Sequence, residues 1–151
     1  MLFRSMLHRI AKITGRDGNQ RRVLEQEKGK SRQALNSAYV ALPDSISKDI
    51  AKCKYRELAH VMWALGKLAE KDHKLVQVCK RAILSRDITA FDNVGIIQIV
   101  SGCMNLDLTA TEISSTLQES IRNGQLKISE FNNQLLSAML MLFTKDRKSV
   151  V

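Results

Sequence analysis

The sequence of 151 residues has little of several residue types, and each shortage argues against a class of protein. With one proline and seven glycines, it is neither collagen-like nor a disordered tail. Aromatic residues make up only 5%, which favours aliphatic packing of helix on helix over a β-sandwich. The three cysteines, at positions 53, 79 and 103, are odd in number and include no Cys-x-x-Cys pair. They fit neither a disulfide framework nor a zinc knuckle, and we expect a reducing compartment.

Long apolar segments are also missing. The C-terminal apolar run covers residues 135–143, which is about half of what a membrane-spanning helix needs. We therefore expect no membrane span. The chain is nevertheless 44% apolar and 26% charged, a balance typical of one globular domain.

Acidic residues are scarce relative to basic ones, and the imbalance lies in the first half of the chain. There are 24 Lys and Arg against 15 Asp and Glu, a net charge of +9. Residues 1–86 hold 19 basic and 8 acidic residues, whereas residues 87–151 hold 5 and 7. Such an excess favours a polyanionic partner or an import signal.

The N-terminal segment has a pattern of its own. Residues 1–16, MLFRSMLHRIAKITGR, place apolar residues at helical spacing with basic residues between them, and the first acid is Asp17. This pattern is typical of an organellar transit peptide, and the alternative is a basic amphipathic helix that docks on a partner. Residues 17–32 are polar and predict an extended basic arm or a short solvated helix. We accordingly divide the chain into a basic arm or presequence-like segment, 1–32, and a helical-repeat domain, 33–151.

An internal repeat organises the second part. The string ITAFDN at residues 88–93 recurs forty residues later as ISEFNN at residues 128–133. Tyr55 stands 36 residues before Phe91 and opens a third apolar helix, and this alignment places Gly66 opposite Gly102. A period of 36 to 40 residues is the length of a two-helix unit. The sequence therefore predicts an all-α fold, a short α-solenoid of antiparallel helical hairpins.

The same pattern predicts where the helices begin and end. Leading helices are expected at residues 55–70, 91–104 and 131–143, trailing helices at 72–84 and 109–121, and a capping unit at 32–41 and 45–52 around Pro43. The expected end signals are N-caps at Thr89 and Ser129, a capping box of Thr109 with Glu112, and a left-handed stop at Asn123-Gly124.

The first leading helix carries a resemblance to a known family. Residues 58–68, LAHVMWALGKL, resemble the L-A-x-x-x-W-A-L-x-K-L string of octotricopeptide and heptatricopeptide repeat proteins of mitochondria and chloroplasts. Those proteins often carry a RAP domain, which we do not see after residue 144. The resemblance covers about residues 45–144 and implies organellar RNA binding by stacked helical hairpins. Short members of such families are similar to proteins that have become ribosome components.

We therefore expect a non-enzymatic RNA-binding protein of the mitochondrial matrix, most concretely a structural component of a mitochondrial ribosome that contacts rRNA through its basic N-terminal half. The alternative is a protein-binding helical-repeat subunit of another organellar complex, such as a respiratory assembly. Phosphate contacts supply affinity without reading the base sequence. The candidate RNA-binding residues are Arg16, Arg21, Arg22, Lys28, Lys30, Arg32, Lys52, Lys54, Arg56, Lys67, Lys74, Lys80, Arg81 and Arg86.

Two further expectations concern apolar side chains. Trp63 is expected to be a core anchor between hairpins rather than a platform for base stacking. The third leading helix has no trailing partner after it, so its apolar face is expected to need a neighbouring protein of a large complex. The candidate interface residues are Leu135, Leu136, Met139 and Phe143.

Catalytic and metal sites are not indicated. The string Gly29-Lys30-Ser31 ends like a phosphate-binding loop, but Leu24 stands where that motif needs a glycine. His8, His60 and His73 have no second His or Cys three or four residues later, so no zinc site is predicted. The cysteines lie on apolar helix faces, where cysteine behaves as a small hydrophobic residue. We expect no catalytic residue, metal, cofactor or small-molecule substrate.

Overall fold

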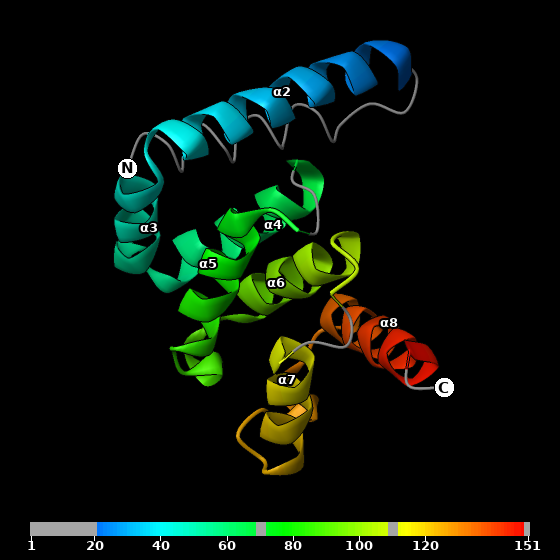
Figure 1. The fold of residues 1–151 in the computed structure, drawn as a ribbon. Coiled ribbons are helices and arrows are strands. Elements are labelled where there is room, and N and C mark those ends of the chain that lie inside the picture. Colours follow the sequence, from blue (N-terminus) through cyan, green and yellow to red (C-terminus); the bar gives the residue numbers. More distant parts are fainter. Residues whose placement is uncertain (1–20, 69–71, 109–111, 150–151) are drawn as a thin grey trace.

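The computed structural model describes residues 21–68, 72–108 and 112–149 of the chain. Within these ranges it describes the side chains of residues 26 and 29–145. The described residues form α-helices and two short 3₁₀ helices and contain no strand, which confirms the all-α prediction (Figure 1). The elements are α2 (Arg21–Ala41), α3 (Pro43–Lys52), α4 (Tyr55–Leu68), α5 (Lys74–Leu84), η1 (Ile88–Ala90), α6 (Asn93–Asn105), α7 (Glu112–Arg122), η2 (Ile128–Glu130) and α8 (Asn133–Ser149).

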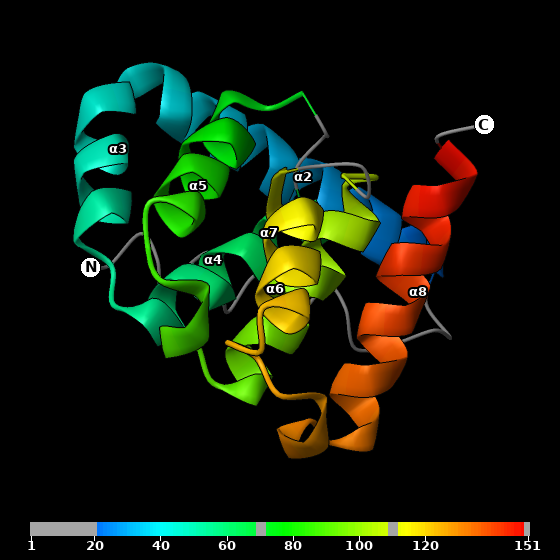
Figure 2. The ribbon, with the colours of Figure 1, turned by 90° about the horizontal axis from the view of Figure 1, so that it is seen from below.

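Six of these helices lie in two rows. In the first row α6 lies between α4 and α8 and packs against both. In the second row α5 lies between α3 and α7, and the rows meet where α4 packs on α5 (Figures 1 and 2). The long helix α2 lies outside the rows and contacts α3 and α4. Within the described residues no helix is both long and apolar enough to cross a bilayer.

The core between the rows is almost entirely aliphatic, as the composition predicts. Leu58, Met62 and Leu65 of α4 are fully buried, and so are Ile96 and Ile99 of α6. These positions recur at intervals of three and four residues, which places them on one side of each helix. Burial of such side chains contributes about 1.5–3 kcal/mol each, so these five residues are a substantial source of stability.

Two glycines allow α4 and α6 to approach closely. A Cβ atom built on Gly66 would lie 2.8 Å from the Cα of Gly102, and one built on Gly102 would lie 2.5 Å from the carbonyl oxygen of Met62. Neither distance leaves room for a methyl group. The sequence alignment placed the two glycines at equivalent repeat positions, and the structure brings their backbones into contact.

The repeated strings ITAFDN and ISEFNN fold in the same way. In each, the first three residues form a 3₁₀ turn and the fifth is the N-cap of a long helix. Asp92 Oδ1 accepts the amide N–H of Gly95 at 2.7 Å, and Asn132 Oδ1 accepts that of Leu135 at 2.8 Å. Carboxylate and amide oxygens satisfy the amides that the first helical turn leaves without partners.

The N-caps predicted at Thr89 and Ser129 are therefore wrong, because both residues lie within the 3₁₀ turns. Thr89 instead donates its amide and its hydroxyl to Asp87 Oδ1. Gly124 has a φ of 75°, which confirms the left-handed stop after α7. The predicted capping box cannot be placed, since Thr109 lies outside the described residues.

The N-terminal helices begin earlier than predicted. Residues 21–41 form one continuous helix, so the predicted boundary between residues 32 and 33 falls inside α2. Pro43 was predicted to lie between two helices, and it is in fact the first residue of α3. That position suits proline, because its missing N–H would have no partner there.

The apolar face of the C-terminal helix α8 is covered by another helix of the same chain. Leu135 and Met139 are buried, because α8 packs against α6. Phe143 is half-buried and packs against the same core, and Leu136 is half-buried as well. The prediction that Leu135 and Met139 need a neighbouring protein is therefore wrong.

Candidate nucleic-acid interface

An open groove lies between α4 and α6 on the surface of the first row. Its volume is about 500 Å³. We call it the α4–α6 groove. It is lined by His60 and Trp63 of α4, by Val94, Ile97, Gln98 and Ser101 of α6, and by Gln134 of α8.

One face of α4 brings positive charge to both ends of this groove. Arg56, His60, Trp63 and Lys67 follow one another at intervals of four, three and four residues, so they form one stripe along the helix. The Lys67 ammonium nitrogen lies 5.8 Å from the centre of the Trp63 ring, within the range of a cation–π interaction. The stripe thus combines two cations with an indole and an imidazole.

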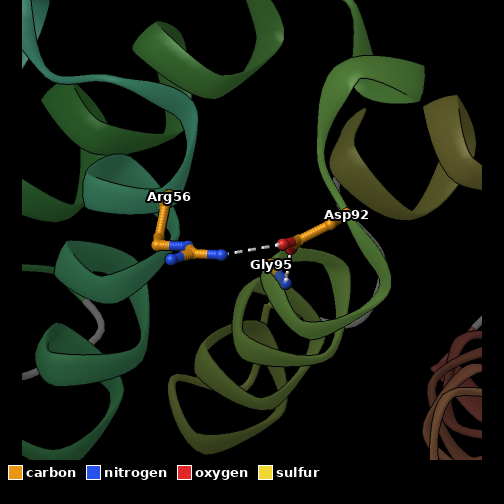
Figure 3. A network of polar contacts seen from close by, with 3 residues as sticks. All are labelled: Arg56, Asp92 and Gly95. Carbon is orange, nitrogen blue, oxygen red and sulfur yellow. Dashed lines mark hydrogen bonds and ion pairs between the residues drawn. The ribbon is translucent and has the colours of Figure 1, made fainter.

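The start of α6 is fixed at the Arg56 end of the groove. Asp92 Oδ2 lies 3.6 Å from an Arg56 nitrogen, while its other oxygen caps α6 at Gly95 (Figure 3). Both charged side chains are exposed, at 78% for Arg56 and 52% for Asp92. An exposed ion pair contributes about 0–1 kcal/mol, so Arg56 can exchange this partner for another anion at little cost.

The α6 side of the groove contains an unsatisfied acceptor. Among the side-chain atoms that the structure describes, Gln98 Oε1 is buried and has no hydrogen-bond partner. A buried acceptor without a donor costs about 1–3 kcal/mol. A ligand N–H group would recover that energy once the Gln98 side chain turns its oxygen toward the groove.

Trp63 lies between the groove and the edge of the core. It is half-buried, whereas its neighbour Met62 is fully buried between α4 and α6. Trp63 therefore packs against the core from its edge and is not the central anchor that was predicted: residues 62 and 63 are about 100° apart around the helix, and Met62 takes the inward position. The indole is left at the edge of the core, beside the groove.

The basic residues predicted from the sequence fall into three groups. Arg16 lies outside the described residues, as do the side chains of Arg21, Arg22 and Lys28. The exposed ones are Lys30, Lys52, Lys54, Arg56, Lys74 and Arg81, and the half-buried ones are Arg32, Lys67, Lys80 and Arg86.

Two of the half-buried cations hold helices together. Arg32 Nε donates to the carbonyl oxygen of Leu68 at 2.9 Å, which ties α2 to the last residue of α4. Arg86 donates to the carbonyl oxygen of Ala51 at 3.1 Å, and its guanidinium lies 5.4 Å from the centre of the Tyr55 ring. Both carbonyls lie at helix C-termini, where cations are favoured. Arg32 and Arg86 were predicted as RNA contacts, and in the structure both hold parts of the chain together.

The three cysteines are buried, as expected for small hydrophobic residues. Burial raises the pKa of Cys103 to about 12 and that of Cys79 further, and the nearby Cys53 and Cys103 add to the effect on Cys79. The thiols of Cys79 and Cys103 therefore stay protonated at neutral pH, which makes them poor nucleophiles. Within the described residues no group of three His, Cys, Asp or Glu side chains is placed to hold a metal ion.

Sequence reasoning named Arg56 and Lys67 but missed the α6 residues of the groove. A single helix shows its stripe in the sequence, but the residues that face it from another helix depend on how the two pack. Comparisons of this chain with protein-family models, with curated proteins and with solved structures found no match. Function is therefore inferred from the groove and the charges around it.

Proposed function

We propose that this protein is a non-enzymatic RNA-binding protein of mitochondria and a structural component of the mitochondrial ribosome, which contacts rRNA through its basic N-terminal half. The observation that carries the proposal is the uneven charge, with 19 basic and 8 acidic residues before residue 87 and 5 and 7 after it. Six of the candidate basic side chains are exposed, so phosphates can reach them. Contacts with phosphates increase the affinity for RNA but do not distinguish one RNA sequence from another.

The architecture that we propose is a short α-solenoid of helical hairpins with a period of 36 to 40 residues. Two observations support it. The helices α4, α6 and α8 stack in one row and α3, α5 and α7 in another. The turn and N-cap before α6 recur before α8 forty residues later. A solenoid presents an extended surface along each row, which suits a long polymeric ligand.

The proposal is tested by reversing charges in the two halves of the chain. Lys52, Lys74 and Arg81 are exposed and lie in the basic half, so the triple variant K52E/K74E/R81E should bind unrelated RNA sequences more weakly by similar factors. If each residue contacts one phosphate, the slope of log K against log salt should flatten by about 2 for single-stranded RNA. Fluorescence anisotropy of labelled RNA at several salt concentrations measures both effects.

The matched control is R122E/K127E/K145E, which changes the net charge by the same amount at three exposed residues of the other half. Lys127 has an ion pair with Glu130 at 3.8 Å, but both side chains are exposed and the loss is small. We expect near-normal RNA affinity for this control. Equal weakening by both triples would mean that only net charge matters and would refute a basic RNA-binding half.

The cellular part of the proposal has its own tests. A reporter fused to the first thirty residues should enter mitochondria, and the endogenous protein should sediment with mitochondrial ribosomes and be released by RNase. A cytosolic reporter would refute the proposed address. Sedimentation in an RNase-resistant complex would favour the second candidate, a protein-binding subunit of another organellar assembly.

One observation favours that second candidate. Leu140 and Met141 of α8 are 66% and 55% exposed, and Val40 and Leu42 are exposed near the junction of α2 and α3. Each of these two pairs leaves large apolar side chains in water, which a protein contact would cover. A ribosomal protein has protein neighbours as well as RNA, so these residues are compatible with both candidates.

A further inference from the structure

We propose that the α4–α6 groove binds one unpaired base of single-stranded RNA, with the base stacked on Trp63 and hydrogen-bonded to Gln98. This inference rests on the proposed RNA binding and deepens it. Phosphate contacts alone would suit duplex and single strand alike, whereas the groove takes a base that is free of its partner.

The size and walls of the groove fit a flat heterocycle. Its volume of about 500 Å³ lies within the range of small-ligand sites. Trp63 contributes an aromatic surface, and Val94 and Ile97 contribute apolar ones. Val94 is 59% exposed although it lines the groove, so it presents an apolar surface there. A stacked base would cover it.

Polar groups in the groove match the edge of a base. Gln98 Oε1 is a buried acceptor that lacks a donor, and a turn of this groove-lining side chain would present the oxygen to an amino group of cytosine or adenine. Ser101 and Gln134 add groups that can donate or accept. An apolar ligand would leave Gln98 unsatisfied, which argues for a base over an aliphatic side chain of another protein.

Lys67 now lies against the Trp63 ring, and a base would displace it. Lys67 and Trp63 are both half-buried, so their cation–π interaction is worth about 0.5–2 kcal/mol, and stacking of a base on an aromatic side chain is worth about 1–3 kcal/mol. Stacking of a base therefore offsets the contact that it replaces, and the displaced ammonium group remains close enough to pair with a phosphate. Arg56 lies eleven residues away on the same stripe, roughly 16 Å along the helix axis. A strand that follows α4 thus has a cation on either side of the bound base.

The chain provides its own reporter for this site, because Trp63 is its only tryptophan. We would titrate the full-length protein with three RNA probes of equal length: a short oligocytidylate, the same ribose-phosphate chain without bases, and a duplex. Intrinsic fluorescence reports stacking on Trp63, and anisotropy of a labelled end reports binding. We expect all three probes to bind and only the oligocytidylate to quench the fluorescence.

A variant separates the groove from the fold. Gln98→Leu removes an acceptor that has no partner, so it should unfold no more easily than the wild type. It should weaken oligocytidylate binding by roughly three- to tenfold and leave binding of the chain without bases unchanged. The matched control is Gln77→Leu, at an exposed position of α5 that does not line the groove.

The possible outcomes test the base-binding groove separately from the proposed RNA binding. RNA binding by anisotropy without quenching, together with an unaffected Gln98→Leu variant, overturns the base-binding groove and leaves the RNA-binding function standing. Equal quenching by the chain without bases also overturns it, since quenching would then not report a base. No binding of any probe refutes the RNA-binding function itself.

Discussion

The contact between Gly66 and Gly102 gives the sharpest test of how α4 and α6 pack. In Gly102→Ala the new methyl carbon would lie 2.5 Å from the carbonyl oxygen of Met62 and 2.9 Å from its carbonyl carbon. Both are backbone atoms inside a helix, so neither can move without the whole helix. The variant must therefore push α4 and α6 apart along the seam that holds Met62 and Ile99.

The size of the effect follows from two opposing terms. Overpacking a well-packed seam costs typically about 1–3 kcal/mol, and a clash with backbone atoms lies at the upper end of that range. Alanine in a helix is more favourable than glycine by about 1 kcal/mol. We expect a net loss of about 2 kcal/mol in the free energy of unfolding. For a chain of this length that corresponds to a melting temperature lower by about 4–8 °C.

The same substitution elsewhere is the control. Gly29 lies within α2, and a Cβ atom built on it meets nothing within 4 Å. Gly29→Ala should therefore stabilise the protein by about 0.5–1 kcal/mol through helix propensity alone. Thermal and urea unfolding of both variants give the comparison. A Gly102→Ala variant as stable as Gly29→Ala would refute the close approach of the two helices.

Three more substitutions or reactions test the assignments. Met62→Ala should lower the free energy of unfolding in urea by about 2–5 kcal/mol because it leaves a buried cavity, and Trp63→Ala should lower it less because the indole lies at an open groove. A larger loss for Trp63→Ala would show that Trp63 is a core residue. Asp92→Ala should cost about 1 kcal/mol through loss of the α6 cap while Asp92→Asn retains most of it, and equal losses would show that the charge matters more than the cap. Cys79 and Cys103 should react with a thiol reagent only after denaturant is added, and rapid labelling of the native protein would contradict their burial. Because burial raises the pKa of both thiols, the free energy of unfolding should fall as the pH rises above about 8.5, where the thiols of the unfolded chain ionise first.

The positions of the helices were readable from the sequence wherever the apolar pattern was strong. The predicted leading helix at residues 55–70 appears as α4, and the predicted trailing helix at 72–84 appears as α5. Their ends were less readable. Thr89 is a good capping residue, but a single 3₁₀ turn delays the start of α6 to the next residue that can cap it, Asp92. Propensity alone cannot show which of two nearby capping residues the chain will use.

The role of α8 was misread for a related reason. The sequence shows that Leu135 and Met139 share one face of a helix, but not which helix covers that face. An incomplete repeat suggested a partner outside the chain, whereas α8 lies against α6 and buries both residues. Apolar periodicity identifies a face that must be buried and is silent about what buries it.

The candidate site illustrates the same limit from the other direction. The stripe of Arg56, Trp63 and Lys67 is visible in the sequence of α4, and the two basic residues were predicted as RNA contacts. Gln98 carries no such signal, because a glutamine in a helix is usually solvated. Its meaning comes from burial of its oxygen beside Trp63, a fact of packing between two helices.

Fold and groove therefore depend on one shared distance, the separation of α4 and α6. Gly66 and Gly102 set that separation where the backbones of the two helices meet, without lining the groove themselves. Larger residues there would move the α6 wall away from Trp63, and a base that stacks on the indole would then no longer reach Gln98. Gly66 and Gly102 stand opposite each other in the alignment of the two segments, and at both positions the close packing of α4 and α6 requires a residue without a side chain.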